Sequence, residues 1–203
     1  MHTVAQVTDK DGNNYKTVKI GTQEWMAENL DVSQFRNGDL IPQAMTGEEW
    51  VKAGDQGKPS WCYYDNDPAN GKIYGKLYNW FAVNDSRGVA PNGWHVPSYS
   101  EWADITNYLG GVNEAGSKMK YTEGWKSNGN GTNESGFAGL ASGNRYNDGM
   151  FLLIGSNGDW WSTLTLESST IFAWYSSLKD DNADISMYVE NKVTGHSVRC
   201  VRD

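Results

Sequence analysis

The chain of 203 residues is poor in proline, cysteine and histidine, and it has no long hydrophobic run. No apolar stretch approaches the ~20 residues that a membrane-spanning helix requires, so the sequence is not membrane-spanning. The first ten residues lack both a basic start and an apolar stretch, and therefore predict no signal peptide. With a net charge of −8 and no cluster of Lys or Arg, the chain repels phosphate backbones on average, which excludes nucleic-acid binding.

The patterns that mark metal and catalytic sites are also missing. His2, His95 and His196 lie far apart, and no Cys or His stands at metal-ligand spacing, so no zinc site is expected. The segment 9–12 resembles the start of a calcium loop but lacks the distal Glu. Neither a nucleophile elbow nor a Gly-rich phosphate loop occurs. We therefore expect no metal, no cofactor and no catalytic residue.

Three residues near the middle of the chain are candidates for acid–base groups. His95 follows Trp94 in a short predicted strand, which favours a core histidine bonded to backbone over a general base. Glu101 and Asp104 are possible acids, but Glu101 has a role at a helix start. Enzymatic chemistry is therefore the disfavoured alternative.

Two cysteines, Cys62 and Cys200, leave two alternatives open. Both are buried free thiols, as is common for cysteine, or they close one long loop in an extracellular domain. The sequence does not decide between them.

Aromatic residues and glycine are abundant instead. The chain has ten Trp, 13% aromatic residues and 23 Gly, which is typical of a loop-rich globular domain with an aromatic core. We expect one domain over residues 1–203. Exposed aromatic rings would form a carbohydrate platform, but the apolar contexts of most Trp favour the core. Those assigned to the core are Trp25, Trp80, Trp94, Trp102, Trp160, Trp161 and Trp174.

The first half of the chain carries the helical signals. The alternation of Tyr15–Ile20 predicts a strand. Capping boxes begin at Thr46 and at Ser98, and each predicts a short helix. Apolar spacing predicts a further helix over Gly75–Asn84, whereas residues 54–72 are predicted to be a long loop.

After residue 124 helical signals are nearly absent, and Gly, Asn and Ser divide the chain into short segments. We predict an α+β fold, with two helices early, short antiparallel strands late, and much irregular loop. The late strands are expected at Phe137–Leu140, Trp160–Thr163, Ile171–Leu178 and Ser197–Arg202.

An ordered series of motifs extends over nearly the whole chain. The motifs are Val18–Leu30, Cys62–Asp67, Tyr74–Trp80, Gly93–Ser98, Gly136–Ala138, Trp160–Ser162 and Ser197–Asp203. Together they resemble one family, the Fibrobacter succinogenes major paralogous domain. The resemblance implies a secreted or surface protein of gut and rumen bacteria with a C-type lectin-like fold that is also similar to formylglycine-generating enzymes. Because no signal peptide is predicted, a virion-associated protein is the other alternative. The calcium–sugar motifs of lectins and the paired C-terminal cysteines of those enzymes are absent here.

Some members of that family look like the variable proteins of diversity-generating retroelements, in which template adenines are randomised. Between residues 146 and 196 most irregular positions carry residues that a mutated Asn codon encodes, whereas Trp is not reachable. Met150, Glu167, Met187 and Glu190 do not fit an Asn origin. The resemblance therefore implies fixed Trp residues with variable positions between them.

The predicted function is a binding protein that presents a diversified, exposed face at residues 144–196 to an external protein or glycan. Tyrosine and phenylalanine supply rigid contact area, and Asp supplies adaptable hydrogen bonds. A satellite core is the alternative for the apolar members, and a fixed carbohydrate site is the alternative function. The predicted ligand-binding residues are Tyr146, Asp148, Leu164, Leu166, Ile171, Phe172, Tyr175, Asp180, Asp181, Tyr188 and His196.

Overall fold

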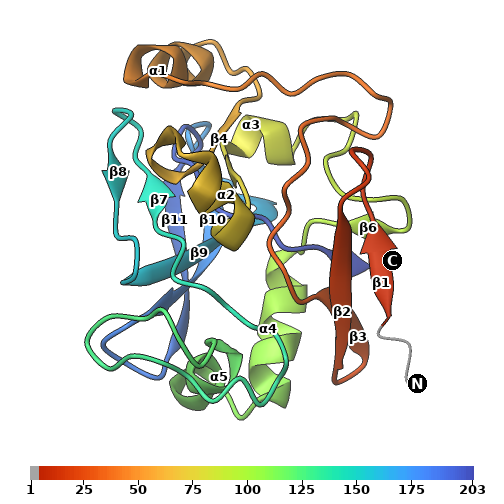
Figure 1. Cartoon of the computed structure of the whole chain (residues 1–203), viewed down its shortest axis with the longest axis vertical. Helices are drawn as coiled ribbons and strands as arrows, with labels where there is room; N and C mark the ends of the chain where they lie inside the picture. The colour runs from red at the N-terminus through yellow and green to blue at the C-terminus, as the bar shows by residue number, and fades with distance from the viewer. Residues whose placement is uncertain (1–4) are drawn as a thin grey trace.

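The computed structural model describes residues 5–203 and has a mixed α+β architecture (Figure 1). Helices and short strands alternate in the first part of the chain, and a meander of three longer strands occupies the last part. His2 lies outside the described residues. Within residues 5–203 the α-helices are α1 (Gly47–Asp55), α2 (Pro68–Tyr74), α3 (Trp80–Val83), α4 (Tyr99–Tyr108) and α5 (Val112–Met119), with a 3₁₀ turn η1 (Tyr64–Asn66).

A five-stranded sheet joins the beginning of the chain to its end, in the order β1-β2-β3-β12-β6. The final strand pairs antiparallel with both neighbours, and Val201 lies opposite Trp25 on one side and His95 on the other. β2, which covers the predicted strand Tyr15–Ile20, therefore lies in the same sheet as the last strand. The strands are β1 (Gln6–Thr8), β2 (Asn14–Ile20), β3 (Gln23–Met26), β6 (Trp94–His95) and β12 (Val201–Arg202).

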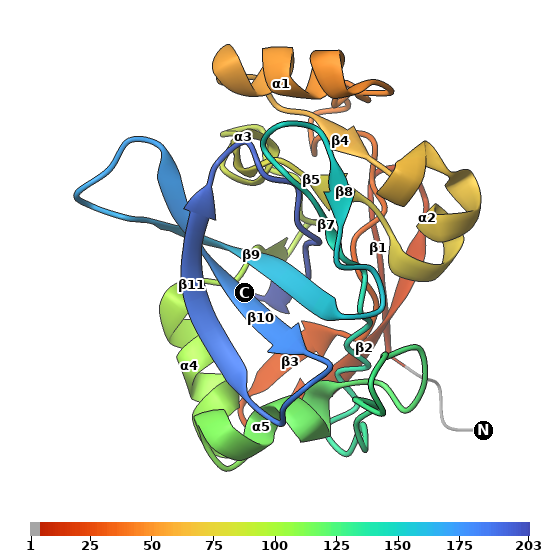
Figure 2. The ribbon, with the colours of Figure 1, turned by 90° about the vertical axis from the view of Figure 1, so that its left-hand side faces the viewer.

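A second sheet of three antiparallel strands, in the order β11-β10-β9, lies face-on in Figure 2. A β-bulge interrupts the β9–β10 register between Ala173 and Tyr175. Two small ribbons, β4–β5 and β7–β8, complete the strands, and β7–β8 lies beside the second sheet (Figure 2). The bounds are β4 (Trp61–Cys62), β5 (Leu77–Tyr78), β7 (Asn144–Arg145), β8 (Phe151–Leu152), β9 (Asn157–Thr165), β10 (Phe172–Lys179) and β11 (Ile185–Asn191).

Large aromatic side chains fill the core, as the composition predicts. Trp160 and Trp161 are adjacent on β9 and point to opposite faces of the strand, as successive residues do. Trp160 packs with Trp102 and Phe137 in one hydrophobic cluster. Trp161 packs in a second cluster with residues from the five-stranded sheet. The pair therefore connects the two sheets to a shared interior.

Both capping boxes form as predicted. The Thr46 hydroxyl accepts the Glu49 amide at the start of α1, and Ser98 caps Glu101 at the start of α4. Each box satisfies donors that a helix start otherwise leaves free. Local sequence therefore determines where these two helices begin.

The predicted helix over Gly75–Asn84 is wrong in most of its length. Leu77 and Tyr78 form β5, and only α3 is helical there. Tyr78 is fully buried and its amide donates to the His196 carbonyl, so pairing with a distant segment overrides the helical spacing. The predicted loop at 54–72 is also partly wrong, because Asp67 caps α2 with Pro68 at its first position.

Two of the predicted late strands are largely irregular. At Phe137–Leu140 the chain turns, since Ala138 has a φ of 53°, which strand residues do not adopt. At Ser197–Arg202 only the last two predicted residues are in a ladder. The structure also contains a helix and a strand that were not predicted. They are α5, which follows α4 after a short turn, and β11. The coarse α+β class is confirmed.

Cys62 and Cys200 are free thiols, and both are fully buried. They lie in different hydrophobic clusters. Burial raises the pKa of each thiol to about 12. The structure therefore corresponds to the alternative of two buried thiols.

Candidate functional site

The predicted ligand-binding residues lie mainly on the three-stranded sheet and on the adjacent β7–β8 turn (Figure 2). They do not all share one face. Ile171 precedes β10 and Asp180 follows its end, so nine residue steps separate them, about 30 Å along the strand. The exposed members are Tyr146, Asp148, Leu164, Ile171, Asp181 and Tyr188; the half-buried members are Leu166, Phe172, Tyr175 and Asp180; His196 is buried.

Aromatic side chains gather on one face of the sheet. Tyr175 lies opposite Tyr188 in the β10–β11 register, with ring centroids 5.9 Å apart. On its other side the Tyr175 ring stacks on His196 at 4.5 Å and an interplanar angle of 22°. Trp161 closes the stack edge-on, 4.4 Å from His196. The cluster grades from buried Trp161 to exposed Tyr188.

The predicted exposure of His196 is wrong. Its side chain is 1% exposed, and neither ring nitrogen has a hydrogen-bond partner among residues 5–203. Burial lowers its pKa to about 3, so the ring is neutral and cannot attract charge from a ligand. The chain around it is held by paired bonds with Tyr78. His196 therefore supports the aromatic face from beneath.

Tyr146 comes close enough to this cluster for electrostatic coupling. Burial raises the pKa of Tyr175, and the charges of Asp159, Glu190, Tyr188 and Tyr146 raise it further. Tyr146 is exposed at the β7–β8 turn. Tyr175 on β10 and Tyr188 on β11 are in ring contact on this side of the sheet, and Tyr146 is exposed on the neighbouring β7–β8 turn.

The long β9–β10 hairpin carries the apolar residues of the predicted site. Leu164 and Ile171 are 41% and 53% exposed, whereas Leu166 and Phe172 are half-buried. The hairpin projects from the body of the molecule in Figure 2. An exposed apolar tip does not fit the alternative of a satellite core, at least for Leu164 and Ile171.

The three carboxylates of the predicted set lie at two places, the β7–β8 turn and the β10–β11 connection. Asp148 accepts the Met150 amide in the β7–β8 turn at 3.0 Å. Asp181 accepts the Asn182 amide group at 2.9 Å in the β10–β11 connection. These Asp side chains therefore order turns, and Asp180 and Asp181 lie at the opposite end of β10 from the apolar hairpin tip.

Trp174 is less buried than predicted. Trp160 and Trp161 have no exposed surface, but Trp174 is half-buried and packs edge-on against exposed Tyr99 at 5.3 Å. Its opposite neighbour Val189 on β11 is also exposed. Trp174 thus covers the outside of the sheet above α4 and is not a core residue.

His95 does not bond to backbone as favoured by the sequence. Its two ring nitrogens lie 2.7 Å from the carboxylates of Glu101 and Asp203. Burial lowers the His95 pKa, but the hydrogen bonds and charges of the two carboxylates outweigh it, and the pKa is raised. Contact with acids on opposite sides gives a charged ring that ties β6, α4 and the last residue together. Among residues 5–203 no group of three or more His, Cys, Asp or Glu could hold a metal ion.

Asp159 is a second buried ionisable group beneath the sheet. It accepts the Ser177 hydroxyl at 2.6 Å and the Asn144 amide at 3.2 Å. Burial raises its pKa to about 6, although these hydrogen bonds act in the opposite direction. Asp159 therefore joins β7, β9 and β10 and has no access to a ligand.

A family model described as the Fibrobacter succinogenes major domain matches residues 18–202. The chain belongs to this family. No curated protein and no solved structure matches this chain. No helix among residues 5–203 is long and apolar enough to cross a membrane.

In this member of the Fibrobacter succinogenes major domain family, the sequence motifs form the interior. Trp25, Tyr78, Trp160 and Val198 come from four different motifs, and each is fully buried. The positions between the late motifs contain the exposed side chains described above. The contrast between buried motif and exposed intervening residue is therefore sharpest within 144–196.

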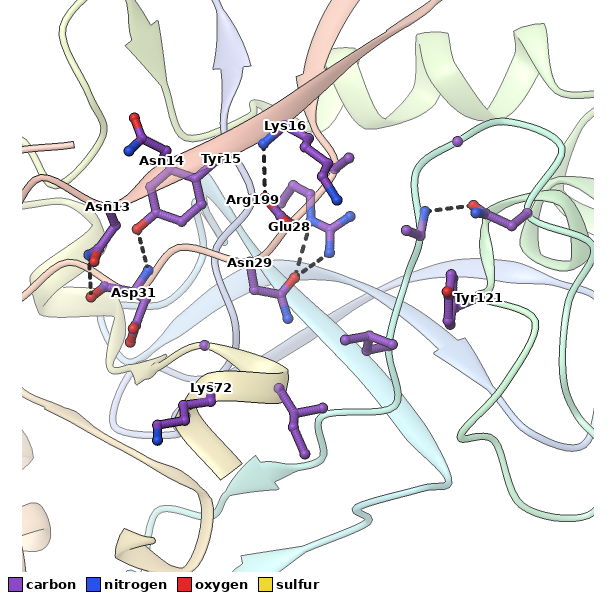
Figure 3. Close-up of a pocket in the computed structure, with 18 residues that line it drawn as sticks. Asn13, Asn14, Tyr15, Lys16, Glu28, Asn29, Asp31, Lys72, Tyr121 and Arg199 are labelled. Carbon is purple, nitrogen blue, oxygen red and sulfur yellow. Dashed lines mark hydrogen bonds between the residues drawn. The ribbon is translucent and has the colours of Figure 1, made fainter. Parts of the chain in front are cut away.

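The sequence reasoning missed a cleft on another side of the domain. Its walls come from β2, the segment after β3, α2 and the loop around residues 133–140, and buried Arg199 lies at its base (Figure 3). These segments are distant in sequence and consist largely of common polar residues. A clue was present in the loop composition around Asn133, but only the fold brings it opposite Lys72 and Asn14.

Proposed function

We propose that this domain binds an external ligand through the exposed residues of 144–196, and that these residues are diversified by a retroelement. The supporting observation is the alternation of buried and exposed positions along the β9–β10 hairpin. Trp160, Trp161 and Ala173 are fully buried, whereas Leu164 and Ile171 in the same hairpin are exposed. A scaffold that holds its own core residues tolerates substitution at the exposed ones.

We further propose that the scaffold is C-type lectin-like and that residues 1–203 form one such domain. In that fold the first and last strands share a sheet and a long loop region presents the ligand site. Here β2, β3 and β12 share a sheet, and the segment 144–196 lies outside it. The mixed α+β architecture agrees with this proposal at its coarser level.

The proposed binding surface is centred on Tyr146, Tyr175 and Tyr188, with Leu164 and Ile171 on the neighbouring hairpin. Tyrosine has a large rigid ring and a polar hydroxyl, so it contacts varied partners at a low entropic cost. Exposed apolar side chains gain by leaving water when a partner covers them. His196 remains in the proposal as the support on which Tyr175 stacks.

The proposed partner is a protein or glycan outside the cell that makes the domain, whether the domain is displayed on a cell surface, secreted or carried on a virion. The proposed action is binding without catalysis. With a net charge of −8, a nucleic acid is not a proposed partner.

Gene sequences provide the most direct experiment. A reverse-transcriptase gene beside this gene, with a near-copy of its 3′ end, is the expected arrangement. Adenine-specific differences between the two copies should fall on codons of exposed residues in 144–196 and spare Trp160 and Trp161. Differences spread evenly over buried and exposed codons would contradict diversification.

A library tests the physical requirement separately. Tyr146, Leu164, Ile171 and Tyr188 are randomised together, and the folded fraction is measured by protease resistance on a display system. Each exposed change should alter the free energy of unfolding by about 0.5 kcal/mol or less, so most members should resist the protease. A matched library at Trp160, Trp161, Ala173 and Ser176, which are all buried, should be mostly degraded.

A further inference from the structure

A cleft of about 570 Å³ lies outside the segment 144–196 and contains a set of polar groups from distant parts of the chain. None of its lining residues belongs to that segment. Its size falls within the range of ligand sites in proteins. Diversification of the proposed surface therefore leaves the cleft unchanged.

A network of hydrogen bonds around Asn29 holds the base of the cleft. Asn29 is buried, and its side-chain oxygen accepts hydrogen bonds from Arg199 at 2.6 and 3.1 Å and from Trp160 at 2.8 Å (Figure 3). Its amide group donates to the Tyr74 carbonyl and to Ser197. Every position on Asn29 is occupied by protein, so it fixes the base and does not contact a ligand.

The walls of the cleft contain backbone conformations that residues with a side chain rarely adopt. Asn133 and Ala138 have φ values of 52° and 53°, and the Asn133 side chain accepts the Ala138 amide at 2.8 Å. On the α2 side, Gly75 has a φ of 72°, and a Cβ there would lie 2.9 Å from the Leu30 carbonyl. Unusual backbone at a cleft is a sign of a preorganised site.

Polar groups in the cleft remain available to a ligand. Among residues 5–203, the structure gives no hydrogen-bond partner to the amide nitrogens of Asn14 and Asn133, the amines of Lys16 and Lys72, or the Tyr121 hydroxyl. Tyr121 and Ile73 are 39% and 59% exposed and add apolar area. Figure 3 shows Tyr121 and Asn14 on opposite sides of the cleft.

The charges in the cleft do not have a single sign. Lys16, Lys72 and buried Arg199 line the cleft together with Glu28 and Asp31, and Glu28 accepts the Lys16 backbone amide at 2.8 Å. Asp31 forms an ion pair of 2.8 Å with Lys76. A strongly anionic or cationic ligand would meet like charges, whereas a neutral polar ligand would not.

We propose that this cleft is a fixed-specificity site for a neutral saccharide, separate from the diversified surface. Hydroxyl groups both donate and accept, so they match a mixture of amides, amines and carboxylate. The exposed face of Tyr121 fits the apolar side of a sugar ring. Every variant of the domain would then bind the same glycan in the cleft, while residues 144–196 differ from one variant to the next.

The experiment uses the full chain on an array of neutral, sialylated and sulfated oligosaccharides, followed by calorimetric titration with the neutral glycan that binds best. Tyr121→Ala should weaken this binding by about fivefold to tenfold through the loss of one stacked ring. Asn14→Ala should weaken it by about fivefold through the loss of a hydrogen bond. Tyr108→Ala is the matched control, since Tyr108 is an exposed ring outside the cleft. Thermal melts of all variants establish that they fold.

Several outcomes overturn the proposal. It fails when no neutral glycan binds, when only charged glycans bind, or when a peptide library yields ligands that Tyr121→Ala abolishes. It also fails when binding survives both cleft variants but is lost in Tyr188→Ser, because the saccharide then sits on the diversified surface. That last result leaves the proposed function intact, and the two proposals are thereby distinguished.

Discussion

The surface of residues 144–196 and the cleft above Arg199 differ in what holds their side chains in place. On the surface, exposed residues extend from strands and turns whose register is set by buried neighbours such as Trp160 and Ser176. In the cleft, the lining residues themselves carry the unusual backbone and close contacts. Exposed residues on the surface of 144–196 can therefore be replaced, because buried neighbours hold the backbone in place. The residues that line the cleft are harder to replace, because they themselves fix its backbone.

The largest expected effect comes from removing Ser197–Asp203, which supports both regions. Val198 and Cys200 are fully buried, and each such side chain contributes about 1.5–3 kcal/mol. Arg199 and β12 are lost with them, so the total approaches the stability of a whole domain, about 5–15 kcal/mol. No cooperative transition should remain in a thermal melt followed by circular dichroism. Removal of exposed Asp203 alone is the control, and a sharp melt in the longer truncation would contradict the assignment.

The next prediction compares a buried and an exposed aromatic residue on the same sheet. Trp160→Ala should destabilise the domain by about 3–5 kcal/mol, because it leaves a cavity and removes one of the hydrogen bonds to the Asn29 oxygen. Tyr188→Ser should change the free energy of unfolding by about 1 kcal/mol or less. Urea titration measures both. Equal losses would show that the exposed surface is not independent of the core.

A smaller effect is expected from pH through His95. Its raised pKa means that the folded state binds this proton more tightly than the unfolded chain. The stabilisation is therefore fully present below the unfolded pKa of about 6.5 and is lost as the pH rises through the folded value. The midpoint of thermal unfolding should fall over this range in the native protein. In His95→Gln that fall should be smaller, and an unchanged profile would refute the role of the two carboxylates.

The smallest predicted effect concerns the reactivity of the two thiols, Cys62 and Cys200, and not the stability of the domain. Two free thiols should react with an alkylating reagent in the unfolded, non-reduced protein. In the folded protein both should react slowly, because burial raises their pKa to about 12 and thiolate is the reactive form. A count of zero after unfolding would establish a disulfide instead.

Local signals in the sequence predicted the elements that local contacts stabilise. The two capping boxes at Thr46 and Ser98 worked because each closes within four residues. The helical spacing before Trp80 failed because Tyr78 pairs with His196, more than one hundred residues away. Periodicity cannot include a partner so distant in sequence.

The candidate surface was predicted in part for the same reason. Tyr146 and Tyr188 stand among polar residues, and both are exposed. His196 stands in a similar polar sequence but is buried, because Tyr175 and Trp161 cover its ring. Trp174 has the apolar neighbours of a core residue, but its side chain is half-buried and packs against exposed Tyr99. Exposure at these positions depends on which face of a strand meets the interior.

By itself the sequence determined the family, the α+β class, the aromatic interior and the two capped helices, since motifs, composition and hydrogen bonds within one turn are local properties. The tertiary structure decided which tyrosines meet beside β11, which ionisable groups become buried, and where a cleft opens. These depend on contacts between segments such as β2, α2 and the Asn133 loop, which only chain folding brings together. The physical reason is that burial is a property of the packed molecule and not of a residue's neighbours along the chain.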